Sequence, residues 1–184
     1  MRLLPLCCAI FALLAGCAPG HGLRPLPRIA VGDYRLGPGD SVRLTTFGEE
    51  QLTGEFRVGA NGMVAVPLLG EVRAAGLTPT QLQDAVAAGL KRRNLLRDPN
   101  VAAEVVEYRP IFVLGEVNKP GQYPYQPGMT MVTAVAVAGG FTYRAVQGYA
   151  SVVRTVDGAA EERKASRDAF VQPGDVLTVF ERRF

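Results

Sequence analysis

Alternation of apolar and polar positions predicts a half-exposed strand near the start of the chain. Val42, Leu44 and Thr46 alternate with polar neighbours, and a Gly-Pro-Gly-Asp turn at 37–40 lies immediately before them. A period of two places one set of side chains on one face of a sheet. We expect the apolar face of this strand to cover a core.

A strand pair is predicted around Asn61-Gly62. This dipeptide favours a two-residue hairpin turn, because Asn and Gly tolerate the positive φ that both turn positions need. The apolar positions that flank the turn are Phe56, Val58, Val64, Val66 and Leu68. We expect the strands on either side of the turn to pair with each other.

Helical spacing follows at 78–90. Thr78, Pro79 and Gln81 supply an N-cap, a first-turn proline and the partner of a capping box. The apolar stripe consists of Leu82, Val86 and Leu90. This pattern predicts a helix that packs one face on the strands, followed by a strand from 101 to 108.

The stretch from Arg109 to Gly140 reads as a strand, a loop and a helix. An apolar run at 111–114 is suited to a strand buried on both faces, and the segment 115–128 is a loop interrupted by prolines and glycines. Thr130 is the expected N-cap of a short helix that ends at Gly139. Its apolar positions are Met131, Val132, Val135 and Ala138.

Two short motifs occur twice. Leu-Gly-Glu-Val stands at 69–72 and at 114–117, and Pro-Gly-Asp stands at 38–40 and at 173–175. Glycine turns recur freely in β-rich folds, so the repetition can arise by chance. The alternative is a chain of two small α+β units, with a boundary near Arg109.

The N-terminus predicts a lipoprotein. Residues 1–16 hold one basic residue followed by an apolar run, which is typical of a secretory signal peptide. Leu-Ala-Gly-Cys at 14–17 is the pattern of a bacterial lipoprotein signal, in which Cys17 becomes the acylated N-terminus. Residues 17–32 are rich in Pro and Gly and read as an extended tether. We therefore expect a lipid anchor, with acyl chains such as palmitate, at Cys17.

The charge balance argues against a nucleic-acid partner. The 184 residues carry a formal net charge of +3, and the densest basic run is Lys91, Arg92 and Arg93 at a predicted helix end. Cations there complement the negative end of the helix dipole. A nucleic-acid-binding protein of this size usually has a clustered basic face.

No catalytic or metal-binding constellation is predicted. The only histidine, His21, lies in the tether, and Cys17 is expected to be acylated. A single folded copy therefore lacks the residues for a Ser/His/Asp triad, a Cys/His pair or an ordinary zinc site. Motifs for nucleotide binding are missing as well, so we expect no cofactor.

One loop combines polar donors with aromatic rings. Asn118, Lys119, Tyr123 and Tyr125 could bind a sugar, whose faces are apolar and whose edges carry hydroxyl groups. Alternatively, the two tyrosines cover the core of their own unit, which is common for half-buried tyrosines. The sequence alone favours this second interpretation.

Several long motifs resemble those of the outer-membrane polysaccharide export lipoproteins. They are YRLGPGD at 34–40, the run 68–79, LRDPNV at 96–101, GEVNKPGQY at 115–123 and AGGFTYRA at 138–145. They occur in the family's order and cover almost the whole mature chain. The resemblance implies an α+β fold of two small domains: a polysaccharide-export domain at 33–108 and a soluble-ligand-binding β-grasp domain at 109–184.

The resemblance also implies a function in export of capsular or extracellular polysaccharide, without an enzymatic step. Family members form rings that meet an inner-membrane polysaccharide co-polymerase. Longer members add a C-terminal membrane helix that this sequence lacks, so we expect a separate outer-membrane channel protein. Ala18 after the cysteine favours sorting to the outer membrane, with the protein facing the periplasm.

Two other function classes compete with the export conduit. A monomeric lipoprotein could hold a glycan or another ligand through the β-grasp loop, and it would differ from the conduit in forming no ring. A periplasmic glycan hydrolase is the third interpretation, although no facing pair of carboxylates is predicted for it.

Overall fold

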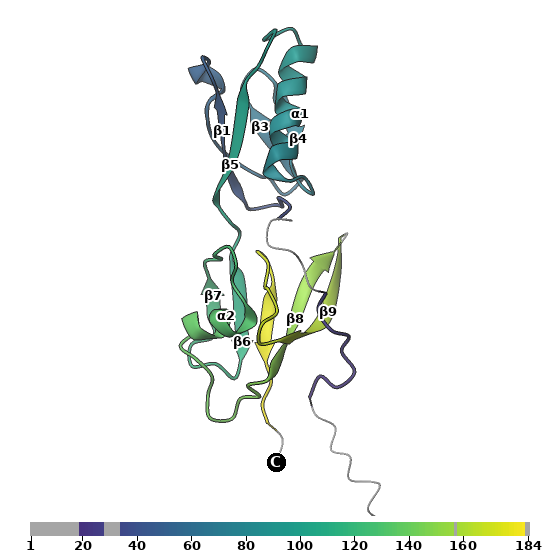
Figure 1. Cartoon of the computed structure of the whole chain (residues 1–184), viewed down its shortest axis with the longest axis vertical. Coiled ribbons are helices and arrows are strands. Elements are labelled where there is room, and N and C mark those ends of the chain that lie inside the picture. The colour runs from purple at the N-terminus through teal and green to yellow at the C-terminus, as the bar shows by residue number, and fades with distance from the viewer. Residues whose placement is uncertain (1–18, 28–33, 157, 183–184) are drawn as a thin grey trace, which may run out of the picture.

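The computed structural model describes residues 19–27, 34–156 and 158–182. The predicted signal peptide, Cys17 and residues 28–32 of the predicted tether lie outside them. The described residues form two α+β regions stacked end to end, each around its own apolar cluster (Figure 1). No helix in the described part of the chain is long and apolar enough to cross a membrane.

The first region contains two small sheets and one long helix. Its elements are β1 (Ser41–Thr46), the 3-10 helix η2 (Glu50–Leu52), β2 (Gly54–Arg57), β3 (Met63–Val66), β4 (Gly70–Arg73), α1 (Pro79–Arg92) and β5 (Val101–Glu107). One sheet has the order β2-β1-β5, and β3 and β4 form the other. Along β1, Val42, Leu44 and Thr46 are buried, as the alternation predicts.

The sequence signals of α1 are confirmed. The Thr78 side chain accepts a hydrogen bond from Gln81 N, and the Gln81 side chain accepts one from Thr78 N, which completes the capping box. Leu82, Val86 and Leu90 are fully buried between the helix and the strands. The helix therefore supplies one wall of the first apolar cluster.

The predicted pairing around Asn61-Gly62 is wrong. A turn does form there, because Gly62 N donates to Gly59 O, and Gly62 has φ +76°. However, β2 pairs with β1 while β3 pairs with β4, so the turn connects two sheets. Leu68, predicted on the return strand, has φ +61° and is 63% exposed in the turn before β4. Tertiary pairing has overridden the local hairpin signal.

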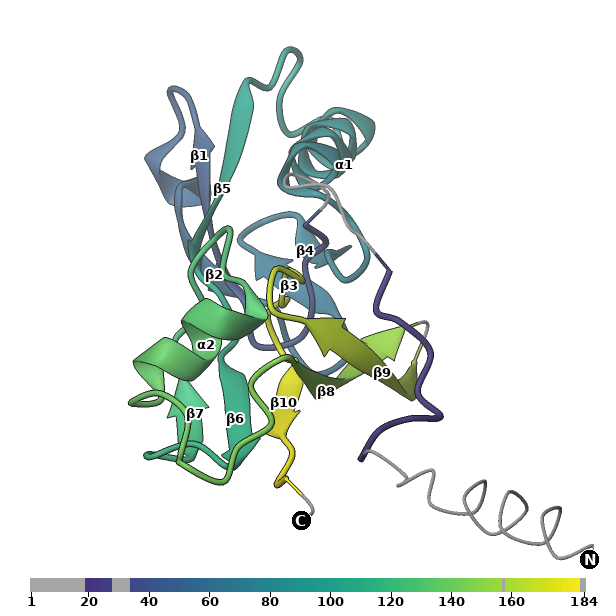
Figure 2. The same ribbon diagram turned by 60° about the horizontal axis from the view of Figure 1, so that its bottom comes forward.

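The second region is a five-stranded sheet with a short helix. Its elements are β6 (Ile111–Gly115), β7 (Gly121–Tyr123), α2 (Met131–Val137), β8 (Tyr149–Val156), β9 (Ala159–Ser166) and β10 (Val176–Val179). The strand order is β7-β6-β10-β8-β9, and only β6 and β10 are parallel neighbours. Helix α2, capped by Thr130 as predicted, lies beside β6 and β7 (Figure 2). Its buried residues Met131, Ala134 and Val135 join the second apolar cluster.

Two expectations for the second region need correction. Strand β6 is buried on one face only, because Ile111 and Val113 are buried while Phe112 and Leu114 are 38% and 43% exposed. The predicted loop 115–128 contains β7, which pairs with β6.

Strand β9 is rich in charged residues and pairs along its whole length with β8. As a partner for β8, this edge strand tolerates many charged side chains.

The described part of the predicted tether packs against the second region. Lys164 in β9 accepts a hydrogen bond from Leu26 N at 2.7 Å and donates one to Arg24 O at 2.8 Å. The Leu26 side chain is buried in the second apolar cluster. Residues 24–26 thus lie along β9 instead of forming a free extended linker.

Candidate functional site

The predicted sugar-binding loop is fastened to the end of α2. Asn118 Nδ2 donates to Gly139 O at 2.8 Å, and Lys119 N donates to Ala138 O at 2.9 Å. These bonds satisfy carbonyl groups that the end of a helix leaves without partners. The Asn118 side chain therefore has a structural role, and the exposed Lys119 side chain is the freest polar group of the four predicted residues.

Both tyrosines of the loop lie against the protein interior. The Tyr123 hydroxyl donates to Lys119 O at 2.5 Å, and its ring packs on the second apolar cluster. The Tyr125 ring packs on the same cluster, and burial raises the pKa of its hydroxyl. This arrangement matches the core-covering interpretation that the sequence favoured.

Tyr125 also takes part in an aromatic row that joins the two regions. Its ring lies 5.4 Å from that of Tyr108, edge to face, and the Tyr108 ring lies 5.0 Å from that of Tyr34. Such edge-to-face pairs stabilise beyond simple area burial. These ring contacts connect the loop of the second region to Tyr34, which precedes the first strand of the first region.

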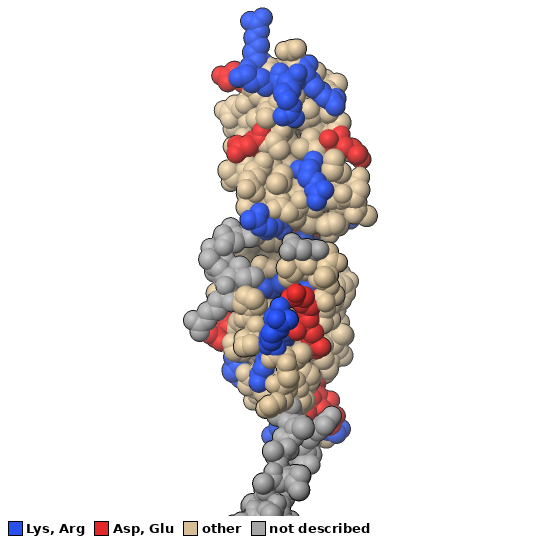
Figure 3. All heavy atoms as spheres, turned by 90° about the vertical axis from the view of Figure 1, so that its right-hand side faces the viewer, with Lys and Arg blue, Asp and Glu red and all other residues tan. Residues whose placement is uncertain are grey.

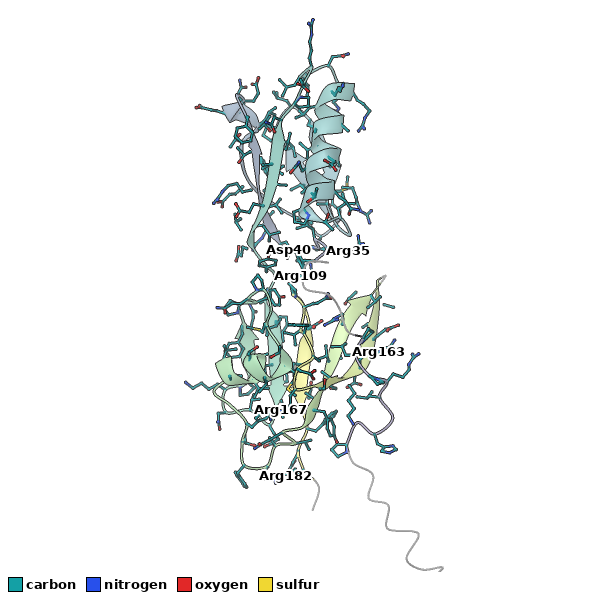
Figure 4. The ribbon with its side chains drawn as sticks, viewed as in Figure 1. Arg35, Asp40, Arg109, Arg163, Arg167 and Arg182 are labelled. Atoms are coloured by element: carbon teal, nitrogen blue, oxygen red, sulfur yellow. The ribbon has the colours of Figure 1, made fainter. Side chains whose placement is uncertain are left out.

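Arg109 holds the two regions together at their junction (Figure 4). Its Nη1 lies 3.1 Å from Asp40 Oδ2 in the first region, and its Nε donates to Pro173 O, at 3.0 Å, in the second. The guanidinium also packs directly on Gly37 and Gly174, where an added Cβ would overlap it. Each glycine belongs to one of the two Pro-Gly-Asp turns, so both turns contact one arginine.

Asp40 is the acceptor at this junction, although its side chain is fully buried. Besides Arg109 Nη1, it accepts hydrogen bonds from Gly37 N at 2.7 Å, from Arg109 N at 2.9 Å and from the Tyr34 hydroxyl. Burial, followed by the hydrogen bond to Asp40, raises the pKa of Tyr34 well above its ordinary value. Tyr34 is thus held neutral as a donor.

A cleft of about 1000 Å3 opens beside this junction, between the first region and β8 and β9 of the second. We call it the arginine cleft after five of its lining residues, Arg35, Arg73, Arg109, Arg154 and Arg163. Glu161 is the only acidic residue among the described lining residues. Lys and Arg atoms are visible at this waist of the molecule in Figure 3.

Among the residues that the structure describes, two of the five arginines have backbone partners only. Arg35 Nη1 donates to Gly76 O at 2.8 Å, and Arg73 Nε donates to Ala75 O at 3.2 Å. Within the described ranges, neither guanidinium forms an ion pair. By contrast, Arg163 binds Glu161 at 2.5 Å and lowers the pKa of that carboxyl group.

Arg154 is the most deeply buried arginine of the cleft, with 7% of its surface exposed. Its Nε and Nη2 bind Asp175 at 2.9 and 2.6 Å, and Nη2 also donates to Phe170 O at 3.2 Å. Its Nη1 is buried and has no hydrogen-bond partner among the described residues. A buried donor without an acceptor is costly, so this nitrogen would gain from an acceptor.

Sequence reasoning did not find the arginine cleft. Its arginines are spread from position 35 to position 163, and each stands in an unremarkable local pattern. The available signal was the repeated Pro-Gly-Asp, since a buried aspartate after a turn needs a cationic partner. Across residues 19–27, 34–156 and 158–182, no group of His, Cys, Asp or Glu side chains has the arrangement of a metal site.

Two family profiles match the chain in succession. The profile described as "Polysaccharide biosynthesis/export protein" matches residues 29–106, and the profile described as "SLBB domain" matches residues 110–162. The first match covers the elements from β1 to β5, and the second begins with β6. The first matched segment therefore lies in the first region, and the second lies in the second region from β6 to the first half of β9, before β10.

Curated relatives with export and transport names are similar to parts of the chain. The exopolysaccharide production protein ExoF of Rhizobium meliloti is 33% identical over 59% of this chain and 28% of its own length. The EPS I polysaccharide export outer membrane protein EpsA of Ralstonia nicotianae is 32% identical over 55% of this chain and 27% of its own. The polysialic acid transport protein KpsD of Escherichia coli is 30% identical over 59% and 20%. The chain thus spans less than a third of the length of these relatives.

Proposed function

The chain belongs to the polysaccharide biosynthesis/export family, and on that premise we propose that it is a non-enzymatic component of a polysaccharide export conduit at the outer membrane. The observation that carries this proposal is the export domain followed directly by an SLBB domain in one chain. The names of similar proteins, which include polysaccharide export and polysialic acid transport, support the same process.

Deletion of the gene in a strain that secretes polysaccharide tests this function. We expect extracellular polysaccharide to be lost while polymer synthesis continues, so that polymer accumulates inside the cell envelope. A plasmid copy of the wild-type gene should restore secretion. Unchanged secretion in the deletion strain would reject the export function.

The proposal includes a lipid anchor at Cys17 and an orientation relative to the membrane. Pro19, two residues after Cys17, accepts a hydrogen bond from the Tyr149 hydroxyl at 2.8 Å. Tyr149 begins β8, at the end of the second region farthest from the first. An acylated Cys17 would place this end at the membrane, with the first region extending into the periplasm.

Cys17→Ser tests the anchor. The serine cannot accept the acyl chains, so we expect the protein to leave the outer-membrane fraction and secretion to decline. The control is the wild-type protein labelled with palmitate in the same strain. Outer-membrane retention of Cys17→Ser, together with normal secretion, would contradict the lipoprotein proposal.

We also propose assembly into a homo-oligomeric ring that meets an inner-membrane co-polymerase, with a separate outer-membrane channel as further partner. Phe112 and Leu114 on β6 project from the face of the sheet opposite the second apolar cluster. Between them and β8 lies β10, where Val176 and Thr178 are half-buried. An exposed apolar face of this kind favours contact with another protomer.

Leu114→Lys should weaken self-association of the full chain in detergent, measured by sedimentation velocity. The matched control is Val137→Lys, which places the same charge at an exposed apolar residue of α2. If the wild-type protein is a monomer, the alternative of a monomeric glycan-binding lipoprotein becomes the better proposal.

The exposed loop residue Lys119, with Tyr123 and Tyr125, remains a proposed contact to glycan or to a neighbouring protomer. Lys119→Glu should reduce secretion or assembly without unfolding the loop, because its backbone bond to Ala138 O is kept. Lys91→Glu at the exposed end of α1 is the control for the change in charge. Wild-type assembly and secretion in Lys119→Glu would leave this loop with a structural role only.

A further inference from the structure

We propose that the arginine cleft binds carboxylated sugar residues of an acidic polysaccharide. This inference rests on the proposed export function and assigns that function a substrate class and a site. The site lies away from the predicted loop at 118–125, on the other side of the junction. It combines residues of both regions, so neither region contains it alone.

The positive charge of the cleft favours binding of an anion. Five arginines line it, and the described carboxylates that face them are Asp40, Asp175 and Glu161. Each of these carboxylates is paired with one arginine, which leaves Arg35 and Arg73 without a counter-ion from the described residues. Each of their exposed guanidinium groups can bind a carboxylate through two parallel hydrogen bonds.

Arg154, which also lines the cleft, has a buried donor that a ligand could satisfy. Arg154 Nη1 has no acceptor among the described residues, although the side chain is nine-tenths buried and its other two nitrogens are saturated by Asp175 and Phe170 O. A ligand oxygen that reached this nitrogen would remove the cost of leaving it unpaired. Because this nitrogen is covered in the structure, a ligand in the cleft that Arg154 lines could bind it only after a small movement of the neighbouring side chains.

The apolar lining and the size of the cleft favour a sugar over a small ion. Tyr34, Leu26, Pro27 and Val156 line the cleft together with the arginines. Rings and aliphatic groups of this kind match the apolar face of a pyranose, while the arginines match its carboxylate. A volume of about 1000 Å3 is at the upper end of the range for organic ligands, and it far exceeds what a single phosphate or sulfate needs.

Isothermal titration calorimetry with the full chain in detergent tests the proposal. The probe is a short oligogalacturonate, and the matched control ligand is its methyl ester, which keeps the sugar rings and removes the carboxylate charge. We expect the oligogalacturonate to bind, with an affinity that falls as salt is added, and the methyl ester to bind at least tenfold more weakly, on the order expected for lost charged hydrogen bonds.

The variant Arg35→Gln/Arg73→Gln locates the site. Both side chains are exposed and free of ion pairs in the described structure, so their loss leaves no buried charge uncompensated. We expect affinity for oligogalacturonate to fall by about tenfold or more. Lys91→Gln/Arg97→Gln removes the same charge at the far end of the first region and should bind as the wild type does. Thermal melting of each variant verifies the fold.

Several outcomes would overturn the proposal. They are equal binding of ester and acid, no binding of either, and unchanged affinity in Arg35→Gln/Arg73→Gln. Loss of self-association in that variant, with no oligosaccharide binding by the wild type, would show that the cleft takes a carboxylate of a second copy. The proposed function fails separately, if secretion survives deletion of the gene while oligogalacturonate still binds in the cleft.

Discussion

The two regions use the same turn to bury an aspartate, yet they neutralise it differently. Asp40 and Asp175 follow Pro-Gly in each region, and their side chains accept from Gly37 N and Gln172 N, both at 2.7 Å. In the second region the arginine partner, Arg154, comes from β8 of the same sheet. In the first region it is Arg109, from the segment that connects the regions.

This difference determines what each ion pair stabilises. The pair of Arg154 and Asp175 is almost completely buried, with side-chain exposures of 8% and 1%, and it belongs to the interior of one region. The Arg109 side chain is 28% exposed and also binds Pro173 O of the other region. One sequence motif therefore serves as a core element in one place and as a joint between regions in the other.

Arg154→Ala should have the largest effect on stability. It leaves Asp175 buried with Gln172 N as its remaining donor among the described residues. Breaking a buried ion pair by removing one partner typically costs about 3–5 kcal/mol. Chemical denaturation followed by circular dichroism should show a loss of this size in the transition of the second region. A loss below about 1 kcal/mol, the range of an exposed ion pair, would mean that the pair is not buried in solution.

The repeated Leu-Gly-Glu-Val offers a second matched pair of positions. Gly115 and Gly70 both have positive φ, at +80° and +82°. An added Cβ at Gly115 would overlap the backbone carbonyl of Val179, whereas at Gly70 the nearest atoms belong to the Arg93 guanidinium, 3.9 Å away. Gly115 ends β6 beside β10, and Gly70 begins the edge strand β4.

Gly115→Ala should therefore destabilise by about 3 kcal/mol, because backbone strain and steric overlap both contribute. Gly70→Ala should cost about 1 kcal/mol from the backbone conformation alone. The measurement is the midpoint of chemical denaturation for the two variants side by side. Equal losses would show that the identical tetrapeptides have equivalent surroundings, contrary to the structure.

Arg109→Ala should have a smaller effect, of about 1–2 kcal/mol. Asp40 keeps three donors, namely Gly37 N, the backbone N at position 109 and the Tyr34 hydroxyl. What is lost is the link to Pro173 O, so we expect the regions to move more freely relative to each other. Small-angle scattering should show a broader range of shapes, and proteases should cleave faster near 108–110. Arg43→Ala, in an exposed ion pair with Glu55, is the control and should change neither.

Local sequence signals predicted the elements that depend on local contacts. The capping boxes at Thr78 and Thr130, the alternation along β1 and the helix stop at Gly139 all rest on residues a few positions apart. The side chains that give these signals contact backbone groups or neighbours a few positions away, so the same local structure is kept in the folded chain.

Pairings between distant segments could not be predicted in the same way. Strand β2 pairs with β1, which precedes it, and not with the strand after the Asn61-Gly62 turn. The exposure of Phe112 depends on what covers that face of the sheet. The arginine cleft arises only when residues from 35 to 163 meet at the junction. A motif such as Pro-Gly-Asp predicts that its aspartate needs a partner, but the fold selects which arginine supplies it.

The smallest expected effect concerns the pH dependence of the joint at Asp40. The pKa of Tyr34 is raised above 10.0 in the folded protein, first by burial and then by its hydrogen bond to Asp40. Above pH 10 the unfolded chain therefore releases a proton that the folded protein keeps, and stability falls as pH rises. Below pH 10 both states hold the proton, so the full contribution is present there.

Tyr34→Phe should weaken this alkaline loss while lowering stability at neutral pH only slightly, by about 1 kcal/mol for one hydrogen bond. The measurement is the melting temperature between pH 7 and about pH 11, beyond the ordinary tyrosine pKa. Tyr143→Phe is the control, because it removes the hydroxyl group of a tyrosine that is 81% exposed. Tyr108 and Tyr125, whose pKa values burial also raises, should retain part of the dependence. If Tyr34→Phe and the wild type lose stability at the same rate above pH 10, the Tyr34 hydroxyl does not donate to Asp40 in solution.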